Sequence, residues 1–139
     1  MVDNLTLQDQ KEFNELGLLV NPNFLKLFNL EDILLSDSDY LIGYYENTKL
    51  IGFLHFTKSF ETIDIVNIVT NPKYRNQGTA TNLLNHLTTM FNDIKTILLE
   101  VNENNLPAIN LYKKNNFKEI YRRTKYYGGE DALIMKRDV

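Results

Sequence analysis

The chain has 139 residues, enough for one domain with a hydrophobic core that needs no disulfide. It has no cysteine, which excludes disulfides, thiolate metal sites and an acyl-cysteine intermediate, and its two histidines are too few for a zinc cluster. A net charge of −3 disfavours nucleic acid as a partner, and without a membrane span or a signal peptide we expect a cytoplasmic protein that binds no metal and no membrane.

The first half of the chain predicts two helices followed by an antiparallel meander. The spacing of Leu7, Phe13 and Leu16 indicates a first helix over residues 6–16. Asn21-Pro22 is typical of an N-cap followed by proline, and it predicts a second helix through residue 34. Aromatic and β-branched runs then predict three strands, at 40–46, 49–57 and 60–70.

The second half predicts a parallel crossover and a final hairpin. A helix to about residue 92 is followed by the short apolar run 96–101, which is typical of a central strand covered on both faces. A further helix and two closing strands are expected at 104–114, 117–127 and 131–137. We therefore predict a single domain over residues 1–139, an α/β (α+β) three-layer sandwich with a mixed sheet.

The segment "IVTNPKYRNQGTATNLL" (68–84) carries the first functional signal. A helix N-terminus offers unpaired N–H groups and about half a positive charge, so it binds phosphate readily. Gly78 and Ala80 would let the backbone approach an anion, and Arg75 would add a charge-assisted contact. A tight strand-to-helix turn explains the same residues.

Two other phosphate-binding motifs fit the segment less well. A P-loop is excluded because no lysine follows Gly78. A dinucleotide-binding fold is disfavoured because the segment has a single glycine.

Together with this loop, the following residues resemble the Gcn5-related N-acetyltransferase superfamily over about half of the chain. Its coenzyme motif is matched by Arg75, Gly78 and Ala80, and its next strand and helix by "LLEVNENNLPAINLYKKNNF". The positions that match in this second motif are Asn105, Ala108, Leu111, Tyr112 and Phe117. Asn116 replaces the usual glycine and also tolerates a left-handed cap. The resemblance implies acetyl-CoA as cosubstrate, bound by Ile68, Val69, Thr70, Arg75, Asn76, Gln77, Gly78, Thr79, Ala80, Thr81 and Asn105.

The C-terminal "KYYGGEDALIM" resembles N-terminal protein acetyltransferases, including the ribosomal-protein-alanine enzymes. The resemblance implies acetyl transfer to a protein N-terminus. Tyr126 and Tyr127 could gate the peptide, and because strand side chains alternate we expect one of them to bind and the other to pack. We expect a monomer or a homodimer. The first 60 residues match these enzymes poorly, and their tryptophan-containing segment is absent. Two alternatives stay open: acetylation of a small amine, which a narrow acidic pocket would favour, and a non-catalytic acyl-CoA-binding domain.

The transfer requires a base, and Glu100 is a charged residue inside an apolar strand. The resemblance implies that Glu100 takes the amine proton and that Tyr112 donates to the departing thiolate. A backbone N–H of residues 67–70 would polarise the thioester carbonyl. The structural alternatives are a solvent-facing or lysine-paired Glu100 and a core Tyr112. We expect His55, His86 and the basic cluster Arg122-Arg123-Lys125 to be ordinary strand, helix and solvated strand residues.

Overall fold

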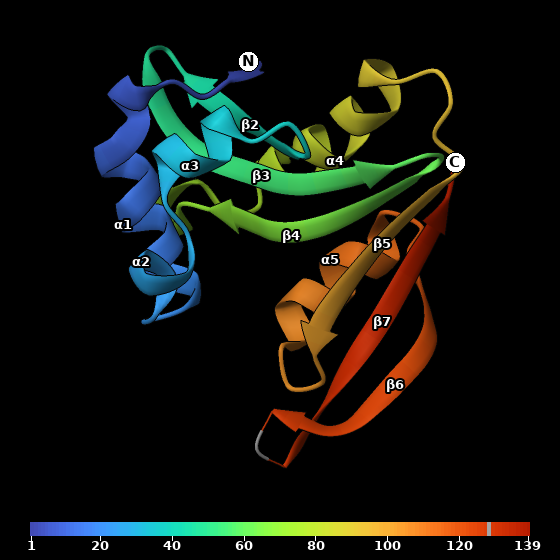
Figure 1. The fold of residues 1–139 in the computed structure, drawn as a ribbon. Coiled ribbons are helices and arrows are strands. Elements are labelled where there is room, and N and C mark those ends of the chain that lie inside the picture. The colour runs from blue at the N-terminus through green and yellow to red at the C-terminus, as the bar shows by residue number, and fades with distance from the viewer. Residues whose placement is uncertain (128) are drawn as a thin grey trace.

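The computed structural model describes residues 1–127 and 129–139, except for the side chains of residues 125–127. A seven-stranded mixed sheet runs through the molecule in the order β1-β2-β3-β4-β5-β7-β6 (Figure 1). Its strands are β1 (Val2–Asn4), β2 (Asp39–Glu46), β3 (Lys49–Ser59), β4 (Thr62–Thr70), β5 (Thr96–Asn102), β6 (Lys118–Tyr127) and β7 (Glu130–Asp138). Its helices are α1 (Gln10–Val20), α2 (Phe24–Leu27), α3 (Leu30–Leu35), α4 (Thr79–Met90) and α5 (Leu106–Lys114). Single 3₁₀ turns precede α1 and α4, at Leu7–Asp9 and Pro72–Tyr74.

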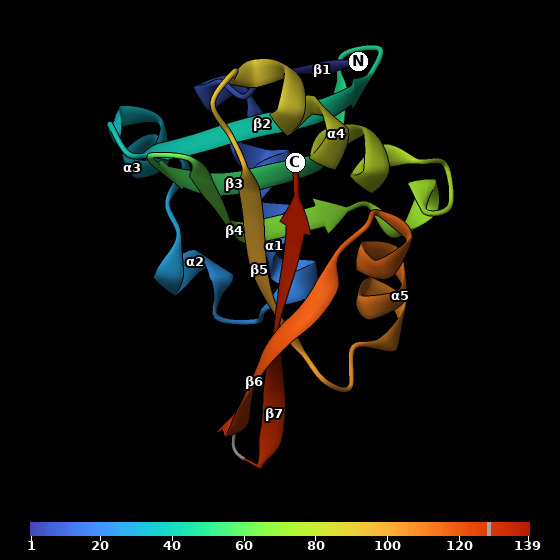
Figure 2. The same ribbon diagram turned by 90° about the vertical axis from the view of Figure 1, so that its right-hand side faces the viewer.

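Two hydrophobic cores lie on the two faces of this sheet. Helices α1, α2 and α3 pack on one face around Phe13, Phe24 and Phe53, and we call it the α1–α3 face. Helices α4 and α5 pack on the opposite face, the α4–α5 face, around Leu83 and Ile109. Figure 2 shows the two helical groups with the sheet between them. The predicted three-layer sandwich is therefore confirmed.

Strands β4 and β5 run parallel but pair over a short stretch. The paired residues are Thr62 with Thr96, Ile63 with Ile97, and Asp64 with Leu98. Beyond Asp64, β4 pairs with β3 and β5 pairs with β7. The two strands then diverge, as Figure 1 shows. A gap consequently opens in the middle of the sheet, on the side where both strands have their C-terminal ends.

The β3–β4 ladder contains an irregularity beside this gap. His55 pairs with Asn67 and Phe56 pairs with Ile65, so Val66 is one extra residue in β4. Such a bulge bends a strand and increases its twist. It therefore lies where β4 begins to turn away from β5.

The N-terminal third differs from the sequence prediction in three places. The helix predicted through residue 34 is two short helices, α2 and α3, because Asn29 is extended and its side chain accepts from the Asp32 N–H at 3.0 Å. Asparagine competes with the helical backbone in this way and favours a cap over a helix interior. Helix α1 continues to Val20 instead of ending at residue 16. The unpredicted β1 pairs with β2 through only three residues.

Strand β5 is central, as predicted, but the prediction that both its faces are covered is wrong. Ile97, Leu99 and Val101 are buried in the core of the α4–α5 face, whereas Leu98 and Glu100 between them are partly exposed. The reason is the position of α1 and α3, which contact β2, β3 and β4. The α1–α3 face of β5 is thus left accessible at Glu100.

Candidate active site

The gap between β4 and β5 leads to a loop that ends at a bare helix N-terminus. Asn71 begins the loop and its side chain accepts from the Lys73 N–H at 3.0 Å. Gly78 ends it as the N-cap of α4 with φ of 80° and ψ of 10°, a left-handed conformation that favours glycine. No side chain caps the first N–H groups of α4. They are therefore available to an anion.

A Cβ added at Gly78 would meet only the Asn82 amide nitrogen, at 3.8 Å, so there is open space in front of the helix. Thr79, in contrast, is buried, and its methyl carbon would lie 3.0 Å from a Cβ at Gly52 of β3. The start of α4 is thus held close to the sheet by Gly52, while its N–H groups face outward.

The other residues predicted to bind the coenzyme lie on β4, in the loop, in the first turn of α4 and at the start of α5. Ile68 and Val69 send their side chains into opposite cores, and because β4 pairs with β3 in antiparallel fashion, the backbone groups of alternate residues point toward the gap. The loop side chains are exposed: Arg75, Asn76 and Gln77. Ala80 and Thr81 lie in the first turn of α4, and Thr70 ends β4. Asn105 lies elsewhere, at the start of α5, where its side chain accepts from the Ala108 N–H at 3.3 Å. Its position supports a capping role.

One polar residue that supports the loop was not predicted. Asn115 is buried, and its amide nitrogen donates to the Thr81 hydroxyl at 3.2 Å and to the Leu111 carbonyl at 2.9 Å. It therefore joins the end of α5 to the first turn of α4. Its neighbour Asn116 has φ of 69°, which confirms the predicted left-handed cap. The sequence marks this pair as a helix end, but gives no sign that one side chain reaches another helix.

Glu100 is the one predicted catalytic residue on the α1–α3 face. Its side chain is 27% exposed, and its Oε1 lies 3.2 Å from Nη1 of Arg123 in β6. Among the side chains that the structure describes, an arginine is thus one partner of the Glu100 carboxylate. Arg123 is also not simply solvated, and Arg122 pairs with Glu103, Glu119 and Asp131. The hydrogen bond to Asp131 raises the pKa of Arg122.

Tyr112 lies on the opposite side of the sheet, in the core of the α4–α5 face. Its ring packs edge-to-face on Phe117 with centroids 5.8 Å apart, and the side chain is 7% exposed. Burial raises the pKa of the Tyr112 phenol to about 12. The two candidate catalytic residues thus belong to opposite faces of the sheet.

A cavity of about 280 Å³ lies on the α1–α3 face beside the bulge. It is lined by Leu27, Phe28, Asn29, Asp32, Ile33, Asp39, His55 and Val66. His55 is 3% exposed, its Nε2 lies 2.7 Å from Asp39 Oδ1, and its Nδ1 lies 3.4 Å from the Asn67 amide nitrogen. The hydrogen bond from His55 holds the pKa of Asp39 below its ordinary value. His55 is a strand residue, as predicted, but its place in a cavity was not predicted.

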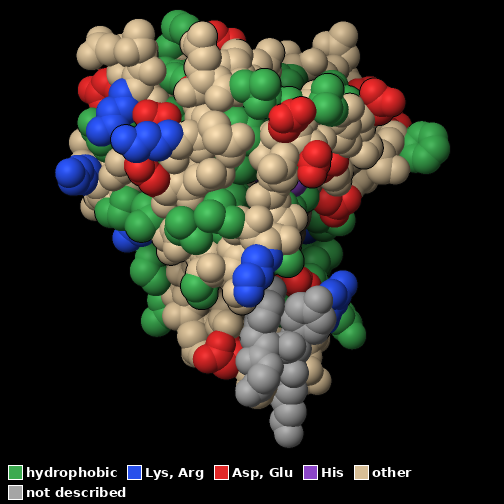
Figure 3. All heavy atoms as spheres, turned by 60° about the vertical axis from the view of Figure 1, so that its left-hand side comes forward, with side chains coloured by type: hydrophobic (Ala, Val, Ile, Leu, Met, Phe, Trp, Pro, Cys, Tyr) green, Lys and Arg blue, Asp and Glu red, His purple; other side chains and the backbone are tan. Residues whose placement is uncertain are grey.

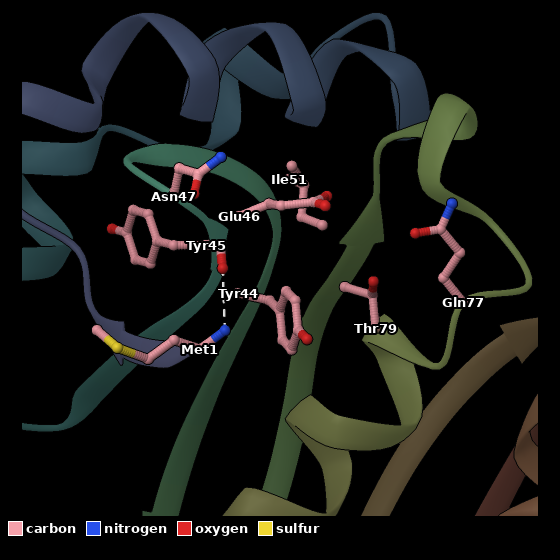
Figure 4. A pocket seen from close by; sticks show the side chains of 8 residues that line it. All are labelled: Met1, Tyr44, Tyr45, Glu46, Asn47, Ile51, Gln77 and Thr79. Carbon is pink, nitrogen blue, oxygen red and sulfur yellow. Dashed lines mark hydrogen bonds between the residues drawn. The ribbon is translucent and has the colours of Figure 1, made fainter.

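A second cavity, of about 380 Å³, lies between the β2–β3 hairpin and the start of α4 (Figure 4). Gln77 and Thr79 line it from the loop side, and Tyr44 and Asn47 line it from the hairpin. The Met1 ammonium closes one end by donating to the Tyr45 carbonyl at 2.9 Å. The loop therefore has open space on the hairpin side as well as in front of α4.

The remaining expectations concern the two C-terminal tyrosines, His86, metal binding and membrane spanning. The side chains of Tyr126 and Tyr127 lie outside the described residues. His86 lies on α4, as predicted for a helix residue. Across residues 1–127 and 129–139, the structure contains no group of three or more acidic or histidine side chains arranged to hold a metal ion. Within the same residues, no helix has the length and apolar character needed to cross a bilayer.

Comparison with known proteins identifies a family. The model of the acetyltransferase (GNAT) family matches residues 6–117. An N-alpha-acetyltransferase from Saccharolobus solfataricus is 44% identical over 77 residues, covering 52% of this chain and 46% of the archaeal protein. The [ribosomal protein bS18]-alanine N-acetyltransferase of Escherichia coli is 34% identical over 96 residues, 65% of each chain. The matched part thus spans less than two thirds of each relative.

Solved structures share the fold over almost the whole chain. The ribosomal-protein-S18-alanine N-acetyltransferase from Escherichia coli superposes with a TM-score of 0.81 and 24% identity, covering 100% of this chain and 93% of that one. A GNAT family acetyltransferase from Elizabethkingia anophelis, solved with acetyl-CoA bound, gives 0.82 and 19% identity over 100% and 97%. These likenesses confirm the predicted fold, including the N-terminal part whose sequence matches poorly.

The buried phenol of Tyr112 predicts a pH-dependent contribution to stability. Its pKa rises from an ordinary value near 10 to about 12 on folding, so its favourable contribution is complete below about pH 10 and is lost as the pH rises toward 12. We expect the unfolding free energy of the wild type, minus that of Tyr112→Phe, to fall by up to about 2.7 kcal/mol across this interval. Urea unfolding at a series of alkaline pH values measures it, and a constant difference would contradict the burial argument.

Proposed function

The chain belongs to the acetyltransferase (GNAT) family, and we propose that it transfers the acetyl group of acetyl-CoA to the α-amine of a protein N-terminus. The observation that carries the proposal is the divergence of β4 and β5 beside the glycine-capped start of α4, with Glu100 accessible across the gap. The start of α4 suits a phosphate, and the diverging strand edges suit amide groups. A cosubstrate that carries both therefore fits this site.

The coenzyme's pyrophosphate fits the N-terminus of α4. The N–H groups of Thr79, Ala80 and Thr81 follow Gly78, and no side chain competes for them at the cap. The pantetheine arm contains amides, which can pair with strand edges as an added strand does. The edges of β4 and β5 that diverge beyond Asp64 supply such groups. The Elizabethkingia structure supports this choice of cosubstrate because it was solved with acetyl-CoA bound.

The reaction is direct attack within a ternary complex. Glu100 accepts a proton from the acceptor amine, directly or through water, and the nitrogen lone pair attacks the thioester carbon. A backbone N–H of residues 67–70 stabilises the developing oxyanion. The carbon–nitrogen bond forms, the carbon–sulfur bond breaks, and the electron pair leaves on sulfur. An α-amine with a pKa near 8 is partly protonated at neutral pH, which is why a base is required.

The acidity of Tyr112 decides how it assists the leaving group. An ordinary thiol has a pKa of about 8.5. A phenol with a pKa of about 12 would therefore not give its proton fully to the thiolate at equilibrium. We assign Tyr112 the role of a hydrogen-bond donor that stabilises the departing sulfur, which takes its proton from the acid formed at Glu100 or from water.

The resting site also contains Arg123, whose guanidinium is 3.2 Å from the Glu100 carboxylate. An arriving α-ammonium carries the same charge and can replace or share this ion pair. The archaeal and bacterial relatives, named for N-alpha and ribosomal-protein-alanine acetylation, support a peptide N-terminus as acceptor. Tyr126 and Tyr127, in the strand that ends next to Gly128, remain our candidates for binding that peptide.

A small cationic amine is the second candidate acceptor. The observation in its favour is the cavity on the α1–α3 face, where Asp32 and Asp39 are lining residues. A non-catalytic acyl-CoA-binding role is less well supported, since the chain contains both Glu100 and Tyr112, the residues that the resemblance implies for catalysis. An assay that compares peptide N-termini, lysine peptides and small amines separates all three functions.

Acetylation of a peptide N-terminus should exceed acetylation of lysine. A lysine amine has a pKa near 10.4 and stays protonated at neutral pH. The assay follows thiol release from acetyl-CoA with peptides carrying a free small N-terminal residue, the same peptides blocked at the N-terminus but containing lysine, and small amines. Mass spectrometry then locates the acetyl group. Acetylation of lysine or small amines alone would reject the N-terminal assignment, and no turnover with any amine would favour a binding domain.

Gly78→Asp should abolish coenzyme binding. The substitution places a carboxylate where we expect the pyrophosphate, next to the bare N–H groups of α4. At about 100 times its dissociation constant, coenzyme A should stabilise the wild type by roughly 2.7 kcal/mol, whereas the variant should gain almost nothing. Thermal melting with coenzyme A, NAD and ATP measures the effect. Thr89→Asp, an exposed position near the other end of α4, should keep the full rise. Equal rises with all three ligands would reject coenzyme specificity.

Glu100→Gln should separate chemistry from binding. The amide keeps the shape of the side chain but cannot accept the amine proton, so turnover at neutral pH should fall about 10²–10⁴-fold. The melting rise with coenzyme A should survive, and raising the pH toward the pKa of the amine should recover part of the rate. Glu103→Gln, which changes a carboxylate paired with Arg122, is the matched control and should keep its turnover. Near-normal turnover of Glu100→Gln would return Glu100 to a structural role.

A further inference from the structure

The cavity on the α1–α3 face is lined half by apolar and half by polar residues, and its carboxylate Asp39 is 27% exposed. Leu27, Phe28, Ile33 and Val66 supply its apolar lining, and Asp39 reaches it from the first residue of β2. A carboxylate in such a place is expensive unless it is paired or hydrogen-bonded.

Asp39 is held in a defined orientation inside this cavity. Nε2 of the buried His55 lies 2.7 Å from Oδ1, and the Ser36 hydroxyl donates to Oδ2 at 2.8 Å. Because the acceptor on Asp39 is ionised, Nε2 carries the proton, and Nδ1 can accept from the Asn67 amide. A carboxylate has about four acceptor positions, so these two donors leave capacity for a further one.

Acidic residues are concentrated in the segment that forms most of the cavity wall. Between Leu27 and Tyr40 the sequence has four acidic residues, Glu31, Asp32, Asp37 and Asp39, and no lysine or arginine, whereas Lys26 directly precedes Leu27. Figure 3 shows acidic side chains gathered at the upper right of that view, with no basic side chain among them. Among the residues that the structure describes, the cavity lining contains Asp32 as a second carboxylate and no lysine or arginine. A group that enters it gains attraction if it is a cation and repulsion if it is an anion.

The cavity adjoins β4, one of the two strands that border the gap. Val66 lines it and forms the bulge at which β4 turns away from β5. Glu100 faces the same side of the sheet from β5, across the gap. An acceptor whose amine lies at Glu100 can therefore extend a side chain past Val66 toward Asp39.

From these observations we propose that the cavity binds a lysine or arginine side chain of the acceptor peptide, with Asp39 as the specificity-determining residue. The inference rests on the proposed function and narrows its substrate class. The aliphatic stem would pack on Phe28 and Val66, and the ammonium or guanidinium would donate to Asp39. Asp32, in the first turn of α3, would add attraction at the wall of the cavity.

Two series of peptides test the proposal with the wild-type protein. The residue is varied at the first position in one series and at the second in the other, as lysine, arginine, glutamine, norleucine or glutamate. We expect lysine and arginine to exceed glutamine in kcat/KM by about tenfold at one of the two positions, with glutamate the poorest. Equal values for lysine, glutamine and norleucine at both positions would overturn the proposal while leaving N-terminal acetylation intact.

Substitutions then assign the preference to Asp39. Asp39→Asn should reduce the lysine-to-glutamine ratio of kcat/KM to near one. Asp37→Asn, an exposed acid two residues earlier that does not line the cavity, should keep the wild-type ratio and turnover. If Asp39→Asn melts too low to assay, Asp32→Asn serves instead and should lower the ratio partly. A ratio unchanged in both variants would refute the assignment.

A small diamine distinguishes the two sources of a cation. We expect 1,4-diaminobutane to compete with the lysine peptide more strongly than with the glutamine peptide, because it can occupy the same cavity. Acetylation of the diamine but of no peptide would overturn the peptide assignment. Absence of turnover with every amine would instead reject the proposed function itself, so the two failures are distinguishable.

Discussion

The architecture depends on how little of β4 and β5 is paired. Three residue pairs at the start of the two strands hold the sheet together, and beyond them each strand pairs only with its other neighbour. Backbone groups at the diverging edges would be costly if they were buried without partners. The gap is therefore a place where an amide-bearing ligand can complete the pairing, and the bulge at Val66 adjusts the direction of β4 beside it.

The divergence also separates two chemical environments. On the α4–α5 face, Tyr112 is packed in a dry core, which keeps its phenol protonated. On the α1–α3 face, the helices stop short of β5, so Glu100 remains partly exposed and pairs with Arg123. A buried phenol and a partly exposed carboxylate thus lie in different environments. The sheet itself forms the boundary between them.

The order of most elements and the coenzyme loop were predictable because they follow from local rules. Gly78 and Asn116 adopt the left-handed conformations that their residue types favour. The break between α2 and α3 was missed because Asn29 interrupts an otherwise helical spacing through its side chain. The partner of Glu100 was not predictable, since Arg123 reaches it across β7, 23 positions away in sequence. The cavity around His55 depends on three separate segments, and no local pattern indicates that they meet.

The short parallel junction has a mechanical consequence. Strands β1 to β4 with their helices form one sub-sheet, and β5 to β7 with α5 form another. Three ladder pairs, the Lys95 and Thr96 amides bonded to the Glu61 carbonyl, and the packing of α4 connect them. Backbone pairing across the sheet is thinnest at this seam, although one hydrophobic core continues beneath it. A ligand lying along both edges would add backbone hydrogen bonds there, and the amide hydrogens of the seam would then exchange more slowly.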